Sequence, residues 1–219
     1  MKTAIVLGAT GLVGKQLVKK LLVNFSFAKV KIFVRRSTGI KDPKLEEHII
    51  NFDKPDEWKR LVTGDVLFSA FGTTLAKAGG KDAQYKIDYT YQYRMAAIAA
   101  DNKVPVYVLI SSAGASPSAM VFYSKMKGEL ERDIMRLPFE KIHIIRPGLL
   151  AGDRDEKRMG EVIGEKVLNI AALIPAFNKY KPIKDVQVAD AMIHAALKND
   201  KGIYRYTLQD VFDLAAMRI

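Results

Sequence analysis

The sequence YSKMK at residues 123–127 sets a tyrosine and a lysine four positions apart. On a helix, this spacing puts both side chains on one face. A free phenol, with a pKa of about 10, is a poor base at neutral pH, but an adjacent ammonium group and an oxidised nicotinamide both favour the phenolate. Tyr123 is then suited to give a proton to a carbonyl that receives hydride, or to take one from an alcohol. We expect Lys127 to assist it and to hold the nicotinamide ribose.

A serine pair precedes this helix and follows the apolar run VPVYVLI at residues 104–110. We expect Ser112 to hydrogen-bond the reacting oxygen and Ser111 to line the cofactor site. Tyr-x-x-x-Lys alone is common by chance. The order along the chain gives it weight, because a glycine turn, paired arginines and a serine at a strand end come before the Tyr/Lys helix.

The glycine turn GATGLVG at residues 8–14 joins the apolar run TAIVL to the amphipathic stretch KQLVKKLLV. Glycines in such a strand-turn-helix unit allow a tight turn and a close approach of backbone to a pyrophosphate, which the helix N-terminus attracts. The spacing Gly-x-x-Gly-x-x-Gly differs from the common Gly-x-Gly-x-x-Gly, and an ordinary glycine-rich turn is the alternative. We expect the whole turn to bind a dinucleotide, through Gly8, Ala9, Thr10, Gly11, Leu12, Val13 and Gly14.

The next strand ends in Arg35 and Arg36, where an NAD site usually carries an acidic residue. Guanidinium groups suit the 2′-phosphate, so we expect NADP(H) to be favoured over NAD(H); the alternative is a pair of solvated loop residues. Asp53 follows the third strand and is expected either to accept a hydrogen bond from the adenine amino group or to cap the helix that KPDEW begins. Small residues after the fourth strand are expected to run beside the cofactor ribose, namely Ala70, Phe71 and Gly72.

Short apolar runs alternate with segments of helical periodicity along most of the chain. Runs that are apolar throughout indicate strands buried on both faces, as in a parallel sheet covered by helices. We therefore predict a doubly wound α/β sheet, the Rossmann fold, in a single domain over 1–219, with a cofactor-binding core at 1–147 and a smaller substrate-side extension at 148–219. Strands are expected at 3–7, 29–34, 48–52, 65–70, 104–110, 141–146 and 202–208, and helices at 12–23, 55–62, 83–101, 122–136 and 187–198.

The composition excludes several classes of site. The chain of 219 residues has no cysteine, so it has no disulfide, thiolate metal site or thiol nucleophile, and its three histidines are scattered. The net charge of +11 favours an anionic partner, but the basic residues are mixed with acidic ones, and nucleic acid is an unlikely partner. No apolar run reaches the roughly 18 residues of a membrane span. We expect a cytoplasmic protein that acts on a small molecule, with its oligomeric state open.

Tyr85, Tyr89 and Tyr93 recur at intervals of four residues. This spacing puts them on one helix face. We interpret that face as packed on the core or on a second subunit, in preference to a surface on which bases stack.

Over nearly its whole length the chain resembles the short-chain dehydrogenase/reductase superfamily. It is most similar to the atypical branch that includes the Tat-interacting oxidoreductase-like proteins and their bacterial relatives. The resemblance implies NADP(H) binding through the glycine turn and the arginine pair, and implies that Pro147 and Gly148 lie near the nicotinamide. The segments that carry the resemblance are GATGLVG, GTTLAKAGG (72–80), SSAGA (111–115), FYSKMKGELE (122–131) and RPGLLAGDRDE (146–156).

Two features depart from the superfamily. Asp88 stands where these enzymes usually carry an asparagine that completes a proton relay, and the part after residue 148 is short for a nucleotide-sugar epimerase. Two functions remain open: an NADP(H)-dependent oxidoreductase acting on a small carbonyl or alcohol, and a weakly active or inactive NADPH-binding sensor with a macromolecular partner. Turnover of a carbonyl substrate separates them.

Overall fold

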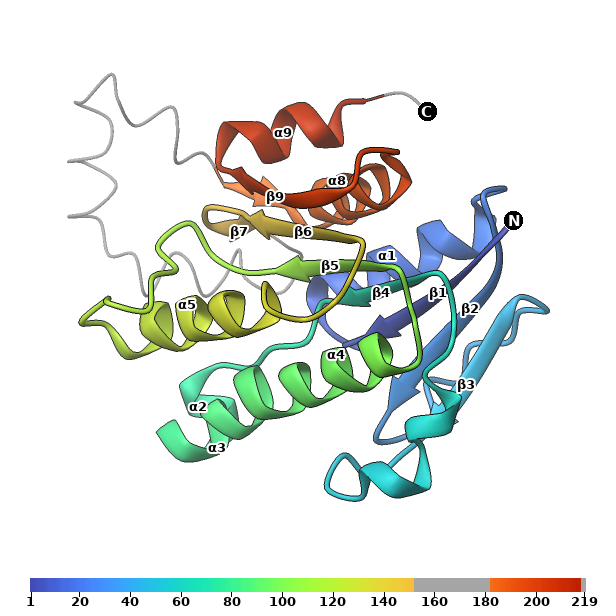
Figure 1. The fold of residues 1–219 in the computed structure, drawn as a ribbon, viewed down its shortest axis with the longest axis horizontal. Coiled ribbons are helices and arrows are strands. Elements are labelled where there is room, and N and C mark those ends of the chain that lie inside the picture. Colours follow the sequence, from blue (N-terminus) through green and yellow to red (C-terminus); the bar gives the residue numbers. More distant parts are fainter. Residues whose placement is uncertain (152–181, 218–219) are drawn as a thin grey trace.

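A parallel sheet forms the centre of the protein. The computed structural model describes residues 1–151 and 182–217. In these residues seven strands lie in the order β3-β2-β1-β4-β5-β6-β9, and every neighbouring pair is parallel (Figure 1). The strands are β1 (Lys2–Leu7), β2 (Phe27–Val34), β3 (Leu45–Ile49), β4 (Val66–Ser69), β5 (Val106–Ile110), β6 (Lys141–Arg146) and β9 (Gly202–Thr207). A separate parallel pair joins β7 (Leu150–Ala151) to β8 (Ile183–Lys184).

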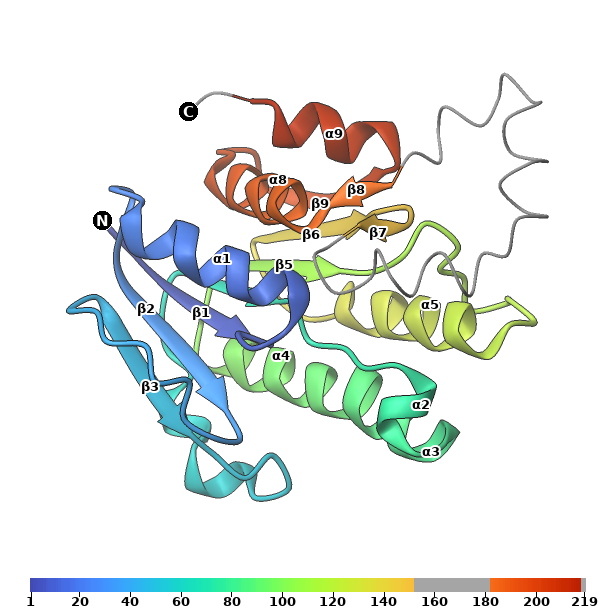
Figure 2. The same ribbon diagram turned by 180° about the vertical axis from the view of Figure 1, so that it is seen from behind.

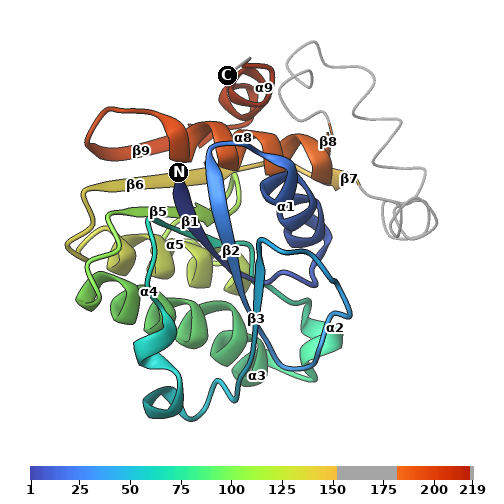
Figure 3. The ribbon, with the colours of Figure 1, turned by 90° about the vertical axis from the view of Figure 1, so that its right-hand side faces the viewer.

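Helices cover both faces of the sheet. One face carries α1 (Leu12–Val23), α8 (Asp185–Leu197) and α9 (Gln209–Ala215), which lie in front in Figure 2. The other carries α4 (Gln92–Asp101) and α5 (Phe122–Ile134), and Figure 3 shows the sheet between the two helical layers. Short helices α2 (Leu75–Ala78) and α3 (Lys81–Tyr85) precede the π-helix η3 (Lys86–Tyr91), which continues into α4. The predicted doubly wound Rossmann fold is confirmed.

Strand β1 shows why the strands are apolar throughout. Ala4 and Val6 belong to the core beneath α1 and α8, whereas Ile5 and Leu7 belong to the core beneath α4 and α5. All four side chains are fully buried. Alternate residues of a strand point to opposite faces, so a strand with a helical layer on each side must be apolar at every position.

Three predicted elements differ from the structure. The third strand is Leu45–Ile49 and not 48–52, because its register is set by pairing with β2, from Val30 opposite Leu45 to Val34 opposite Ile49. The predicted helix at 55–62 is two 3-10 turns, Pro55–Glu57 and Lys59–Leu61. The helix predicted at 83–101 contains the π-helical segment. The division at residue 147 stays a prediction, since much of the expected extension, residues 152–181, lies outside the described part.

Candidate active site

Loops that follow β1, β4, β5 and β6 meet at the carboxyl edge of the sheet. The amide of Ala70 donates to the carbonyl of Leu7 (2.9 Å), and the amide of Ala113 donates to the carbonyl of Pro147 (3.1 Å). These bonds continue the pairing of the strands into the loops. The carboxyl edge is where ligands bind in doubly wound sheets, and most of the site residues expected from the sequence are brought together there.

The glycine turn is packed too closely for any other residue at two of its positions. Gly8 has φ of 91°, and a Cβ there would overlap the carbonyl oxygen of Ala70. A Cβ at Gly14 would overlap the carbonyl oxygen of Gly8. Gly11 donates its amide to that same carbonyl at 2.9 Å. The glycines therefore let the turn close tightly and bring the start of α1 against the end of β1.

The first turn of α1 has free hydrogen-bond donors. Lys15 donates its amide to the carbonyl of Gly11 (3.0 Å), but the amides of Leu12, Val13 and Gly14 find no acceptor within the described ranges, and no side chain caps the helix. Such a helix start binds anions, because the free N–H groups and the helix dipole both favour negative charge. The side chains of Ala9 and Val13 are buried in the core, so these residues offer a ligand only their backbone; Thr10 is exposed.

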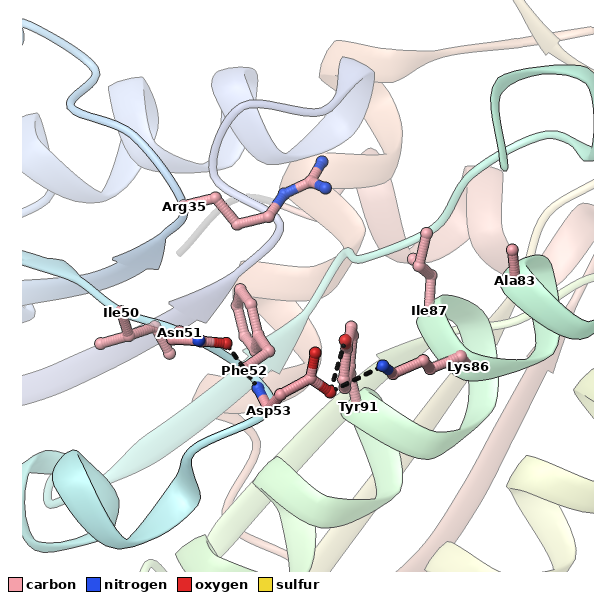
Figure 4. Close-up of a pocket in the computed structure, with 9 residues that line it drawn as sticks. All are labelled: Arg35, Ile50, Asn51, Phe52, Asp53, Ala83, Lys86, Ile87 and Tyr91. Carbon is pink, nitrogen blue, oxygen red and sulfur yellow. Dashed lines mark hydrogen bonds and ion pairs between the residues drawn. The ribbon is translucent and has the colours of Figure 1, made fainter. Parts of the chain in front are cut away.

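Arg35 and Arg36 follow β2 directly and are both exposed. Neither side chain forms an ion pair with any residue that the structure describes. Figure 4 shows Arg35 over a cavity of about 470 Å³. The cavity is also lined by Ile50, Asn51, Phe52, Asp53, Ala83, Lys86, Ile87 and Tyr91.

Asp53 lies in this cavity and is held by two residues from η3. Its Oδ1 accepts a hydrogen bond from the Tyr91 hydroxyl (2.9 Å) and pairs with the Lys86 ammonium at 2.8 Å (Figure 4). The hydrogen bond from Lys86, with a smaller contribution from Tyr91, lowers the pKa of Asp53. The capping alternative is wrong, because the first 3-10 turn begins after Lys54 and no side chain caps it. Lys86 and Tyr91 were not predicted as partners of Asp53, because no local pattern in the sequence relates them to it.

Aromatic rings connect this cavity to the loop after β4. Phe71 stacks on Phe52 with centroids 5.3 Å apart, and Phe52 stacks on Tyr91 at the same distance. Ala70 is half-buried, as is Phe71, whereas Gly72 is exposed. The backbone of 70–72 therefore lies between the cavity and the other loops of the carboxyl edge, where it can border a ligand.

Tyr123 and Lys127 lie one turn apart on α5. The Tyr123 side chain is 40% exposed, whereas Lys127 is only 3% exposed, with its Nζ 6.0 Å from the centre of the Tyr123 ring. The cation is thus enclosed beside a phenol that a substrate can reach. Lys127 is shielded from water, so its charge acts on the phenol more strongly than it would at the surface.

The loop that carries the serine pair is tied to the start of α5. Ser116 donates its amide to the carbonyl of Ser124 (3.1 Å), and a Cβ at Gly128 would overlap the backbone of Ser116. Ser112 is half-buried at the head of this loop, and the Ser111 hydroxyl is buried with no partner in the described part of the chain. Gly128 was missed, although a glycine inside a helix is a recognised sign of close packing.

Pro147 and Gly148 follow β6, and Pro147 is buried. Arg146, the residue before them, forms an ion pair with Glu131 of α5, in which Nε donates to Oε1 at 2.9 Å and a second bond joins Nη2 to Oε2. This pair links the end of β6 to the helix of Tyr123 and Lys127. Nothing in the sequence indicated it, because the two residues come from different elements.

The three tyrosines at intervals of four, Tyr85, Tyr89 and Tyr93, form a row that packs against α5. Tyr85 donates its hydroxyl to Glu129 (3.2 Å) and Tyr89 donates to Asp133 (2.8 Å). Tyr89 stacks on both Tyr85 and Tyr93. The row therefore fits the first of the expected roles, a helix face packed within the chain.

The described residues contain neither a metal-binding cluster nor a membrane-spanning helix. Within residues 1–151 and 182–217, no three His, Asp or Glu side chains gather into a set that would hold a metal ion. None of the helices in these ranges combines the length and the apolar character that a membrane span requires.

Comparison with known proteins gives a family match over most of the chain. Residues 8–196 match the family model described as NAD(P)H-binding. The chain is 36% identical over 206 residues to "Protein fmp52, mitochondrial" of Aspergillus fumigatus, covering 90% of this chain and 88% of the relative. It is 36% identical over 203 residues to "Protein FMP52, mitochondrial" of Candida albicans, covering 90% and 89%.

Solved structures share the fold. The Bordetella bronchiseptica enzyme WbmH, solved in complex with NAD+, has a TM-score of 0.68 and 14% identity, and the match covers 97% of this chain and 79% of that one. These matches confirm the resemblance to atypical short-chain dehydrogenases/reductases at the level of an NAD(P)-binding Rossmann domain. The expected cytoplasmic location is contradicted by the two fungal relatives, which are both named as mitochondrial proteins.

Proposed function

The chain belongs to the NAD(P)H-binding family, and on that premise we propose that it is an NADP(H)-dependent oxidoreductase acting on a small carbonyl or alcohol. One observation carries the proposal: an accessible phenol, Tyr123, lies beside an enclosed ammonium, Lys127, at the carboxyl edge of the sheet. Binding of the cofactor ribose could use Lys127 alone, whereas an accessible phenol beside it is the arrangement that proton transfer requires. Fold alone would not support an activity.

The residues of the site fit the parts of a dinucleotide. The free amides of Leu12, Val13 and Gly14 suit the pyrophosphate. Arg35 and Arg36, exposed and unpaired within the described part, suit a 2′-phosphate. Asp53 is kept ionised by Lys86 and faces the cavity, where its carboxylate can accept a hydrogen bond from the adenine amino group. We assign the nicotinamide end to Ser111, Pro147, Gly148 and the backbone of 70–72.

The bound cofactor supplies or accepts a hydride, and the chain handles the proton. Tyr123 donates its phenolic proton to the oxygen of a carbonyl, or removes one from an alcohol in the reverse direction. Lys127 stabilises the phenolate that remains, because its charge is close and shielded from water. Ser112 hydrogen-bonds the reacting oxygen and keeps it near the phenol.

The cofactor assignment is tested by calorimetric titration with NADPH and, separately, NADH in moderate salt. We expect NADPH to bind more tightly, and Arg35→Ala/Arg36→Ala to remove the preference, with a loss of about tenfold in NADPH affinity for each lost phosphate contact. Arg60→Ala, an exposed arginine of the second 3-10 turn, is the control and should bind as the wild type does. Equal binding of both cofactors would make the arginines ordinary loop residues.

The chemistry is tested with Tyr123→Phe. We expect the variant to lose turnover on a panel of aldehydes, ketones and quinones while it binds NADPH within about twofold of the wild type, because the substitution removes only the hydroxyl. Turnover that survives the substitution contradicts the assigned role. Tight NADPH binding by a wild type that reduces none of the panel would favour the alternative of a cofactor-binding sensor.

A further inference from the structure

Asp88 is a carboxylic acid enclosed in the interior of the site. It lies in η3, is 1% exposed, and accepts a hydrogen bond at Oδ1 from the amide of Thr73 (2.7 Å). Its Oδ2 has no hydrogen-bond partner in the described part of the chain. A Cβ added to Gly72 would stand 3.9 Å from both carboxyl oxygens. The carboxyl group is therefore packed against the backbone of the loop that we expect to border the cofactor.

The charge that acts on this carboxyl comes from Lys127. Of the groups that face Asp88 from the surrounding elements, Thr73 and Gln84 are neutral and Lys127 of α5 is charged. The acids of α5 itself are engaged elsewhere: Glu129 by Tyr85, Glu131 by Arg146 and Asp133 by Tyr89. Burial raises the pKa of Asp88, and the charge of Lys127 partly opposes this effect.

Lys127 is a buried cation, as Asp88 is a buried acid. It is 3% exposed and forms no ion pair within 4 Å among the residues that the structure describes. A buried cation is costly unless a nearby negative charge compensates it. Asp88 and Lys127 are buried on two elements that pack together, η3 and α5, and no ion pair within 4 Å joins them. The centre of the Tyr123 ring lies 6.0 Å from the same ammonium.

We infer that Asp88 is a positioning residue whose buried carboxylate is the counter-charge of the Lys127 ammonium and so sets how strongly that ammonium acts on the Tyr123 phenol. When Asp88 is ionised, its charge offsets that of Lys127 at the phenol. When Asp88 is neutral, Lys127 acts alone and favours the phenolate more. The consequence for the reaction rests on the proposed function, whereas the electrostatic coupling itself needs no substrate.

Asp88→Asn separates this electrostatic role from a structural one. The amide oxygen of asparagine can still accept the hydrogen bond from Thr73, so a residue that only anchors the loop after β4 would be replaced without effect on Tyr123. A counter-charge would not be replaced, because asparagine carries none. We therefore expect Tyr123 in the variant to ionise at a lower pH than in the wild type.

The experiment follows the phenolate absorbance of Tyr123 during a pH titration. Subtraction of the matching Tyr123→Phe protein removes the signal of the other eight tyrosines. We expect the midpoint to fall by roughly half a pH unit or more in Asp88→Asn, as for the loss of one nearby charge, and to rise in Lys127→Met. An unchanged midpoint in Asp88→Asn overturns the inference. Should that variant fail to fold by circular dichroism, Asp88→Ser, which keeps an acceptor for Thr73, is judged by the same criterion.

The pH profile of turnover distinguishes this inference from the proposed function. In Asp88→Asn, the limb of the turnover profile that we assign to Tyr123 should shift in the same direction as the midpoint of the phenolate absorbance. A spectroscopic shift in a protein without turnover would support the inference and count against the proposed function. If turnover depends on Tyr123 but the phenolate midpoints of the wild type and of Asp88→Asn coincide, the proposed function is supported and the inference is overturned.

Discussion

The guanidinium group of Arg146 holds the carboxylate of Glu131 in a two-pronged ion pair that joins the end of β6 to α5. Glu131 is 2% exposed and lies one turn beyond Lys127. Arg146 is followed directly by Pro147. The pair therefore fixes the helix that carries Tyr123 and Lys127, the residues we propose for proton transfer, against the strand whose loop we assign to the nicotinamide.

Removal of one charge of the Glu131–Arg146 pair should lower the free energy of unfolding. Glu131→Gln keeps the size of the side chain but leaves Arg146 without its counter-charge, and breaking a buried pair in this way typically costs about 3 kcal/mol. Urea unfolding measures the loss. The matched control is Glu140→Gln, which breaks the exposed pair with Lys201 and should cost less than about 1 kcal/mol. Similar losses in the two variants would contradict a special role for the Glu131–Arg146 pair.

Gly14→Ala should destabilise the protein, although alanine normally stabilises a helix relative to glycine by about 1 kcal/mol. The added Cβ would overlap the carbonyl oxygen of Gly8, so the turn or the helix must move, at a cost of about 1–3 kcal/mol. Thermal unfolding of Gly14→Ala should show a lower Tm, and NADPH titration should show a weaker affinity. Gly114→Ala, whose Cβ would meet only the Ser124 hydroxyl at 3.4 Å, is the control; a Gly14→Ala protein as stable as this control would refute the argument.

His143 should make the protein less stable in acid. Burial, with smaller effects from Lys141 and Lys198, lowers the pKa of His143 from its usual 6.5 to about 4. Between pH 6.5 and pH 4 the unfolded chain binds a proton at His143 that the folded chain does not bind. The stability contributed by neutral His143 is therefore complete above pH 6.5 and is lost as the pH falls towards 4. The loss by pH 4 is about 3 kcal/mol.

The measurement compares urea unfolding of the wild type and of His143→Gln between pH 7 and pH 4. Glutamine does not titrate, so the stability of the variant should depend less on pH over this range. The difference between the two curves isolates His143 from the carboxylates that also titrate in acid. Parallel curves would show that His143 does not titrate between these values.

The interior strands could be predicted to within two residues at each end, because burial on both faces favours apolar residues at most positions. Strand β3 was displaced in the prediction because it lies at the edge of the sheet and carries the polar run Glu46, Glu47 and His48. Its bounds depend on pairing with β2, which local sequence does not reveal. The π-helical segment was missed for a similar reason, since its sequence fits an ordinary helix.

The places of the glycine turn and of the Tyr/Lys pair could also be predicted from the sequence, because the role proposed for each needs residue types at a fixed short spacing. The environments of these residues could not be predicted from the sequence. Asp53 is held by Lys86 and Tyr91, and Asp88 is enclosed with Lys127, only because distant segments meet in the fold. Sequence spacing thus identifies groups that act within one helix or turn, whereas charge compensation between elements requires the structure.

The position of β1 has a consequence for biosynthesis. Residues 2–7 are synthesised before residues 66–69, yet β1 lies inside the sheet, between β2 and β4. Parallel neighbours cannot form as a tight hairpin, so one edge of β1 stays unpaired until residues 66–69 have been made. An unpaired apolar edge invites association with other chains. The topology therefore leaves β1 open to association for as long as β4 is missing, a hazard that no contact of the finished fold reveals.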